Sequence, residues 1–132
     1  MNRLKAKYLI DTVILIDHLN GHKEATKWLK ANSDGESVIS VITSAEVLSG
    51  AKDKEMADII LLLDNYRCLD IDKNIADKAA ELRRKNNWRL PDAFQAALAI
   101  NHKVSLVTRN TKDVNDKKYA FVKIPYRFKS LK

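Results

Sequence analysis

Apolar residues follow two different spacings along this chain, and the alternation between them predicts a succession of strands and helices. Short apolar runs, typical of buried strands, occupy residues 7–11, 37–42, 67–71, 104–108 and 119–124. Apolar residues three or four positions apart predict helices at residues 12–19, 22–32, 53–66, 72–87 and 91–101, and Thr43 or Ser44 is expected to cap one more. Strands that alternate with helices predict an α/β fold, with a mainly parallel sheet of four to five strands covered on both faces.

Length and composition indicate one globular domain spanning residues 1–132, with a basic tail at residues 125–132. The 132 residues are 45% hydrophobic and 31% charged, which is too apolar for a disordered chain. Only three glycines and two prolines occur, so a turn-rich β-sandwich is excluded. The single cysteine, Cys68, excludes an internal disulfide and a multi-cysteine zinc site. Because Cys68 falls within a strand pattern, it is expected to be a small core residue.

The sequence contains no membrane-spanning pattern. Its longest strongly apolar run, residues 59–63, is five residues long, whereas a span needs about 18 to 20. The basic and apolar beginning is interrupted by Asp11 and Asp17, and no cleavage site for a secretion signal follows. We therefore expect a cytoplasmic protein with no membrane partner.

Charge is distributed unevenly along the chain. The formal net charge is +7, yet residues 1–66 carry 8 basic and 10 acidic side chains, whereas residues 67–132 carry 16 and 7. A basic half of this size is typical of proteins that bind a polyanion such as nucleic acid. A solvated, solubilising surface would produce the same bias, so charge alone leaves both interpretations open.

Four carboxylates are placed where the ligands of an α/β sheet usually bind, outside the carboxyl ends of the strands. Asp11 ends the first predicted strand, Glu46 lies in the first helical turns after the second, and Asp113 follows the fourth. Asp92 opens the helix that precedes the fourth strand. Clustered carboxylates repel one another unless a cation neutralises them, and ligands of this kind suit Mg²⁺ or Mn²⁺ better than zinc. Such ions activate water and stabilise the oxygens of a phosphodiester undergoing hydrolysis.

Each of these carboxylates also has a structural explanation. Asp92 and Glu46 lie near helix starts, where a negative charge complements the helix dipole, and Asp113 resembles an ordinary loop residue. Asp11 is harder to explain in this way because it lies between two strongly apolar stretches, where an unpaired carboxylate costs several kcal/mol. Asp11 is therefore the strongest functional candidate of the four.

Other possible sites are weaker. His18 and His22 are four residues apart, but Gly21 interrupts their helix and no third ligand accompanies them, so surface histidines are expected rather than a zinc site. Arg83, Arg84 and Lys85, with Arg89 nearby, form a basic cluster shortly before Asp92. Beside an acidic metal site this cluster could clamp a phosphate, and without one it is an ordinary charged helix end. Phosphate-binding glycine loops and a Gly-x-Ser-x-Gly motif are absent from the sequence.

Four stretches in series resemble the motifs of PIN-domain ribonucleases of the VapC type, the toxin half of a toxin–antitoxin pair. These stretches are residues 8–19 (YLIDTVILIDHL), 42–51 (ITSAEVLSGA), 90–99 (LPDAFQAALA) and 106–113 (LVTRNTKD). The resemblance covers nearly the whole chain, and the motifs occur in the family's order. This chain departs from the usual pattern in having Val13 in place of Asn or Ser, Val114 in place of Phe, and Asn101-His-Lys103 where a glycine commonly precedes the fourth strand.

The resemblance implies a three-layer α/β/α PIN-like fold and metal-dependent endonucleolytic cleavage of RNA. It further implies that Asp11, Glu46 and Asp92 hold Mg²⁺ or Mn²⁺, and that Asp113 completes the site or binds a second ion. Thr12, Thr108 and Asn110 would position water, metal or phosphate. Arg83, Arg84, Arg89 and Arg109 are expected to contact RNA. A cognate antitoxin that blocks the site, and a homodimer, are also implied.

Three other functions remain possible at this point. One is a PIN-type RNA-processing nuclease without an antitoxin, and another is a non-catalytic RNA-binding module in which the carboxylates are structural. The third is a receiver-like signalling domain, whose acidic cluster also binds Mg²⁺ at the edge of a parallel sheet. A receiver requires an acidic pair after the first strand, and only Asp11 is present there.

Overall fold

A five-stranded parallel sheet forms the centre of the protein. The computed structural model describes residues 6–110, 112 and 114–128. The strands lie in the order β3-β2-β1-β4-β5, and every neighbouring pair is parallel. They are β1 (Tyr8–Ile10), β2 (Ser37–Ser40), β3 (Arg67–Leu69), β4 (Ser105–Val107) and β5 (Val122–Lys123). The expected α/β fold class is confirmed.

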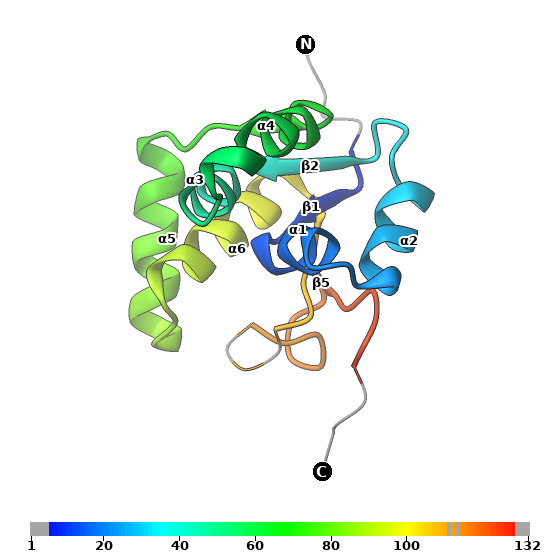
Figure 1. Cartoon of the computed structure of the whole chain (residues 1–132). Helices are drawn as coiled ribbons and strands as arrows, with labels where there is room; N and C mark the ends of the chain where they lie inside the picture. The colour runs from blue at the N-terminus through cyan, green and yellow to red at the C-terminus, as the bar shows by residue number, and fades with distance from the viewer. Residues whose placement is uncertain (1–5, 111, 113, 129–132) are drawn as a thin grey trace.

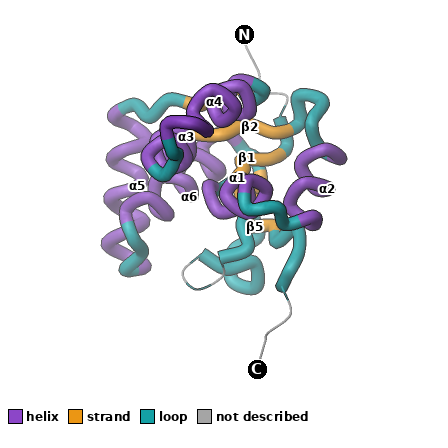
Figure 2. The backbone as a smooth tube through the Cα atoms, viewed as in Figure 1, coloured by secondary structure: helices purple, strands orange, loops and turns teal. Residues whose placement is uncertain are grey.

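Helices connect the strands and cover both faces of the sheet (Figure 1). They are α1 (Thr12–Leu19), α2 (Lys23–Ala31), α3 (Val41–Ser49), α4 (Met56–Asp64), α5 (Lys73–Asn86) and α6 (Leu90–His102). A short 3₁₀ turn, Asp53–Glu55, precedes α4, so the single helix expected over residues 53–66 is divided in two. Figure 2 shows the strands in the interior with helices around them.

Alternation of side chains along each strand creates two separate apolar cores. Leu9, Val38 and Leu106 lie side by side in the parallel register and pack against α5 and α6. Ile10 and Val107 point to the opposite face, together with Ile39, and pack against α1 to α4. Both faces of the strands are therefore buried, which explains why their sequences read as continuous apolar runs.

Small residues bring α6 close to the sheet. Ala93, Ala96, Ala97 and Ala99 are fully buried on this helix, and together they expose almost no side-chain surface. A methyl group occupies little space, so the helix axis can approach the strands more closely than larger residues would allow. The first turns of α6 are thereby held beside the carboxyl ends of β1 and β2.

The start of α3 differs from the sequence expectation. Ser40 caps this helix, and its hydroxyl accepts a hydrogen bond from the Thr43 backbone N–H at 3.2 Å. The sequence predicts Thr43 or Ser44 as the cap, because the β-branched Val41 and Ile42 continue the strand pattern. Because Ser40 caps the helix, Val41 and Ile42 belong to the first turn of α3 rather than to β2. As a result, Thr43 is buried and faces the site described below.

Two other expectations about the strands were wrong. Cys68 is exposed, because β3 is an edge strand of the sheet and Cys68 lies outside both apolar cores. The fifth strand is only two residues long, and Tyr119 belongs to the turn before it.

At the end of α6, Lys103 adopts a left-handed backbone conformation with φ of 56°, at the place where the resembling family usually has glycine.

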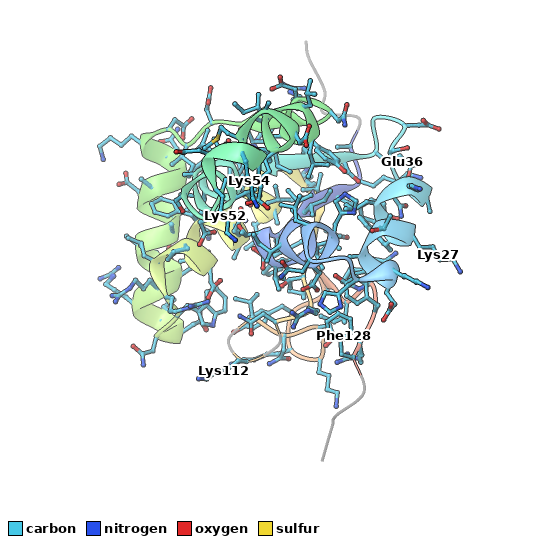
Figure 3. The ribbon with its side chains drawn as sticks, viewed as in Figure 1. Lys27, Glu36, Lys52, Lys54, Lys112 and Phe128 are labelled. Atoms are coloured by element: carbon cyan, nitrogen blue, oxygen red, sulfur yellow. The ribbon has the colours of Figure 1, made fainter. Side chains whose placement is uncertain are left out.

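The segment after β5 packs more closely than a peripheral tail would. Tyr126 contacts the core that lies under α1 to α4, and its hydroxyl donates a hydrogen bond to Asp17. The Phe128 ring lies 4.7 Å from the His22 ring and 5.4 Å from the Tyr126 ring, measured between centroids. Figure 3 shows Phe128 on this segment. Within the described part of the basic tail, residues 125–128, Tyr126 and Phe128 are therefore held against the domain.

The strand order also decides one of the open alternatives. A receiver domain has the order 2-1-3-4-5, which places its third strand in the centre of the sheet. Here β3 is at an edge and β2 separates it from β1, so Asp70 after β3 lies far from the position a phosphoacceptor would occupy. The receiver hypothesis is excluded.

Among the described residues, no helix has the length and apolar character needed to cross a membrane.

Candidate active site

One cleft at the carboxyl end of the sheet brings together three of the four predicted carboxylates. Asp11 follows β1, Glu46 lies on α3 and Asp92 lies in the first turn of α6. All three line a cleft of about 420 Å³. Its other polar lining residues include Thr12, Asp17, His22, Arg89, Gln95, Arg109 and Asn110. Asp113 lies outside the described residues, so its predicted place in the site stays a prediction.

Asp11 is held firmly at the base of the cleft. Its Oδ1 accepts hydrogen bonds from the Thr12 backbone N–H at 2.9 Å and from the Gln95 amide at 3.2 Å. Its Oδ2 accepts one from the Thr108 hydroxyl at 2.7 Å. Since Asp11 also caps α1, its backbone and side chain are both fixed by local structure.

The surroundings of Asp11 make its negative charge costly. Burial raises the pKa of the Asp11 carboxyl and outweighs the hydrogen bonds from Thr108, Gln95 and Thr12, each of which lowers it. The nearby charge of Glu46 raises the pKa further. A bound cation would remove this cost, because an adjacent positive charge favours the ionised form.

The other two carboxylates are each contacted by a neighbouring side chain. The Thr12 hydroxyl lies 2.7 Å from Glu46 Oε1 and 3.1 Å from the Thr43 hydroxyl. Arg89 Nε donates to Asp92 Oδ2 at 3.3 Å, across the first turn of α6. Thr12 was predicted to support the site, and it does contact one of the predicted acids.

The chemistry of these donors suits a hard divalent cation. The three carboxylates that line the cleft offer oxygen atoms, which Mg²⁺ and Mn²⁺ prefer, and the raised pKa of Asp11 indicates a negative charge without full compensation. Within the described residues, no three acidic, histidine or cysteine side chains lie close enough to enclose a single ion. His18 Nδ1 shares a 2.7 Å hydrogen bond with the Thr26 hydroxyl.

Thr108 and Asn110 organise the loop after β4. The Thr108 side chain is buried and donates to Asp11, while its oxygen accepts the Asn110 backbone N–H at 3.1 Å. Asn110 in turn accepts the backbone N–H of Lys112 at 3.3 Å through its side-chain oxygen. These contacts form a loop that ends the strand and places Asn110 in the wall of the cleft.

The four predicted RNA-binding arginines occupy different positions. Arg89 lines the cleft, whereas Arg83 and Arg84 lie exposed in the last turn of α5 and do not line it. Arg109 also lines the cleft, and its guanidinium forms two hydrogen bonds with Asp17. Only two of the four arginines therefore lie at the cleft itself.

Sequence reasoning missed the buried polar groups around Asp11. Gln95, Ser40 and Thr43 are almost completely buried and are hydrogen-bonded to one another behind it. The available signal was a polar residue, Gln95, at a position of α6 surrounded by alanine and leucine. Asp17 was noted only as an interruption of an apolar stretch, although its side chain is just 3% exposed and is paired with Arg109.

Comparison with known proteins identifies the fold that carries this site. The family model described as "PIN domain" matches residues 8–117. The chain belongs to the PIN-domain family. The four carboxylates predicted from sequence all lie within the matched region.

Individual relatives indicate which kind of PIN-domain protein this chain is similar to. Ribonuclease VapC10 of Mycobacterium tuberculosis is 33% identical over 108 residues, which are 77% of this chain and 81% of the relative. A toxin–antitoxin complex from Klebsiella pneumoniae contains a chain with 36% identity and a TM-score of 0.83, covering 92% of this PIN-domain protein and 99% of that chain. The structure of VapBC2 from Rickettsia felis bound to a DNA fragment from its promoter contains a chain with 22% identity and a TM-score of 0.72. The match covers 92% of this chain and 98% of that chain, and at this identity it supports only the assignment of the fold. This PIN-domain protein is a homologue of the VapC ribonuclease toxins, as the sequence motifs predicted.

Proposed function

We propose that this protein is a divalent-metal-dependent endoribonuclease that acts as the toxin of a type II toxin–antitoxin pair. The observation that carries the proposal is the convergence of Asp11, Glu46 and Asp92 from three separate elements on one cleft. Burial and the nearby charge of Glu46 make the negative charge of Asp11 costly, and that cost is explained if the acids that line the cleft bind a cation. Homology with ribonuclease VapC10 supports RNA as the substrate.

The proposed ligands of Mg²⁺ or Mn²⁺ are Asp11, Glu46 and Asp92, with Asp113 as a fourth acid. When bound, the ion supplies an activated water and stabilises the charge that develops on the phosphodiester oxygens. The protein's own contribution is orientation. Thr12 and Thr108 hold the carboxylates of Glu46 and Asp11, and Asn110 presents its amide at the cleft wall, where a phosphate or water can be bound.

Basic residues around the cleft would bind the RNA backbone. Arg89 is the best placed, because its side chain is 70% exposed and lies at the cleft beside Asp92. Arg83 and Arg84 extend the positive surface along the end of α5, about one turn before the loop that leads to Arg89. Arg109 also lines the cleft, with its guanidinium paired to Asp17. Phosphate contacts of this kind provide affinity without specifying sequence.

A cognate antitoxin and a second copy of this chain are the proposed protein partners. The Klebsiella pneumoniae relative was solved as a toxin–antitoxin complex, and at 36% identity it supports the same type of partner here. An antitoxin that covers the cleft would prevent RNA from reaching the carboxylates. We place the pair in the cytoplasm, where RNA substrates are available.

Two alternatives give different experimental results. A PIN-type RNA-processing nuclease without an antitoxin would cleave RNA in the same metal-dependent way but would not arrest growth when induced alone. A non-catalytic RNA-binding module would bind RNA and leave it intact. The costly charge of the partly buried Asp11 favours catalysis over the second alternative, because phosphate binding by arginines needs no acidic cluster.

The decisive experiment combines induction in cells with cleavage by the purified protein. We expect growth arrest on induction, and new RNA 5′ ends that map to defined positions in total RNA. Purified protein should cleave the mapped RNA with Mg²⁺ or Mn²⁺ and stop when EDTA is in excess. Asp92→Asn should fail in both assays. Cleavage that continues undiminished in EDTA would disprove the metal-dependent mechanism.

A further inference from the structure

Gln95 is a buried amide inside an otherwise apolar helix. It is 1% exposed, and the five α6 residues Ala93, Ala96, Ala97, Leu98 and Ala99 around it are fully buried apolar residues. Burying an amide is costly unless its hydrogen bonds are satisfied. Every buried side-chain nitrogen and oxygen among the described residues has a partner, so the site around Gln95 is built to hold this amide.

Hydrogen bonding to Ser40 decides which way the Gln95 amide points. The Ser40 oxygen accepts the Thr43 backbone N–H, and the Ser40 hydroxyl donates to Gln95 Oε1 at 2.7 Å. This leaves Gln95 Nε2 on the other side, where it donates to Asp11 Oδ1 at 3.2 Å and to the Thr43 oxygen at 2.8 Å. Rotating the amide by 180° would place its oxygen against the Asp11 carboxylate, so the observed orientation is strongly favoured.

The two oxygens of Asp11 are therefore not equivalent. A carboxylate oxygen offers about two lone pairs. Oδ1 accepts hydrogen bonds from the Thr12 backbone N–H and from Gln95, which occupy both of its lone pairs, whereas among the described residues Oδ2 accepts one hydrogen bond, from the Thr108 hydroxyl. One lone pair of Oδ2 thus remains for a further ligand, and the side chain lies at the wall of the cleft.

A second branch of the hydrogen-bond network leads from Gln95 through Thr43 and Thr12 to Glu46. Thr12 has one hydroxyl proton, and the shorter contact of 2.7 Å to the Glu46 carboxylate takes it. The Thr43 hydroxyl then donates to Thr12, while its oxygen accepts from Gln95. Donors therefore point in one direction through Thr43 and Thr12 toward Glu46, and each hydrogen bond in such a chain strengthens the next.

We infer that Gln95 is a positioning residue that orients both Asp11 and Glu46 for metal binding, with Asp11 offering Oδ2 as its single coordinating oxygen. This inference rests on the proposed function. The alternative is that Gln95 only joins α6 to β2 and α3 through Ser40 and Thr43, and has no influence on the ion. The two interpretations differ in what happens to metal affinity when the amide is removed.

The test replaces Gln95 with methionine, which has a similar length and shape but no amide. Isothermal titration calorimetry with Mn²⁺, without RNA, measures the metal affinity of the full-length protein. Loss of a residue that orients metal ligands typically weakens affinity by 10- to 100-fold, so we expect the Mn²⁺ dissociation constant of Q95M to rise by about that factor. In cleavage assays, the Mn²⁺ concentration for half-maximal rate should rise in parallel, with the KM for RNA within about twofold of the parent.

Two further variants separate an effect on Mn²⁺ affinity from a general loss of stability. Leu98→Val removes one buried methylene from the same helix and lowers stability without touching the network, so its Mn²⁺ affinity should equal that of the parent. Thr43→Val interrupts the branch to Glu46 but leaves the contact between Gln95 and Asp11. We expect its Mn²⁺ affinity to fall between the parent and Q95M. Thr43→Val also supplies the test if Q95M does not fold.

The possible outcomes separate this inference from the proposed function. A parent protein that binds Mn²⁺ while Q95M and T43V bind it equally well would overturn the role of Gln95 and leave the nuclease proposal intact. A parent protein that binds no Mn²⁺ would overturn both. Weakened binding in Q95M and T43V, with unchanged binding in L98V, would support the inference.

Discussion

Arg109 binds Asp17 through two parallel hydrogen bonds, from Nε to Oδ2 and from Nη2 to Oδ1, the latter at 2.9 Å. Tyr126 donates a third bond to Asp17 Oδ2 at 2.8 Å. One carboxylate on α1 therefore joins the loop after β4 to the segment that follows β5. The Arg109 guanidinium also lies over the Phe128 ring, 4.7 Å from its centroid, which holds the same segment against the wall of the cleft.

We predict that Asp17→Asn destabilises the protein. The substitution removes the charge that a fixed arginine faces in a nearly buried position, and breaking a pair of this kind costs roughly 3 kcal/mol. Urea denaturation at pH 7 measures the loss of unfolding free energy.

Two further variants calibrate this loss. Tyr126→Phe, which removes one hydrogen bond to Asp17, should cost about 1–2 kcal/mol. Asp77→Asn, which breaks the exposed pair with Lys73, should leave the unfolding midpoint unchanged. If Asp17→Asn unfolds at the parent's midpoint, the pair contributes nothing to stability.

The same pair should make stability depend on acid pH. Burial acts to raise the pKa of Asp17, but the hydrogen bonds from Arg109 and Tyr126 outweigh it and the pKa lies below its ordinary value of 3.8. A lowered pKa in the folded state means that the ionised carboxylate stabilises the fold above about pH 4, and that this contribution disappears as pH falls through the folded-state pKa. We therefore expect the difference in unfolding free energy between parent and Asp17→Asn to be constant from pH 7 to 5 and to shrink below pH 4. A difference that grows on acidification would contradict the assignment.

Asp11→Asn should abolish cleavage while leaving the fold intact. The amide keeps the size of the carboxylate, its oxygen can accept from Thr12 and Gln95, and its NH₂ group can donate to Thr108. Burial raises the pKa of Asp11, so the folded state holds its negative charge less well than water does. In EDTA, the melting temperature of Asp11→Asn should therefore equal or exceed that of the parent. Added Mn²⁺ should raise the melting temperature of the parent only. A variant that melts well below the parent in EDTA would indicate that Asp11 is a structural residue.

Arg89 should contribute more to RNA binding than Arg83 or Arg84, because of these three it alone lines the cleft. Each phosphate contact that is lost should reduce the slope of log K against log salt by about 0.7 for single-stranded RNA. We expect Arg89→Ala to show this reduction in filter binding or fluorescence anisotropy, and Arg83→Ala and Arg84→Ala to show a smaller one, with Asp11→Asn, which we expect not to cleave RNA, as the background. Lys27→Ala removes one charge from α2, pointing away from the sheet in Figure 3, and should leave the slope unchanged. Equal slopes for the three arginine variants and their common background would show that these arginines form only a solvated helix end.

Local sequence was sufficient for the elements and for the general location of the site. Parallel strands end at the same edge of a sheet, so Asp11 and Glu46, which follow β1 and β2, had to lie near one another. The helix α6 runs back along the sheet before β4, which brings Asp92 at its start to the same edge, and all three carboxylates line one cleft. The burial of Leu9 and Ile10 on opposite faces follows from the twofold alternation of a strand. These properties depend on spacing along the chain, which a sequence displays directly.

The remaining features depend on which segments become neighbours in space. Cys68 has the pattern of a buried strand, and only the strand order, with β3 at the edge, exposes it. Gln95 becomes a partner of Asp11 across 84 positions of sequence, and Tyr126 a partner of Asp17 across 109. A polar side chain in an apolar stretch signals that a partner exists, because an unsatisfied buried group is costly. Which residue that partner is depends on long-range packing, and so only the tertiary structure could identify it.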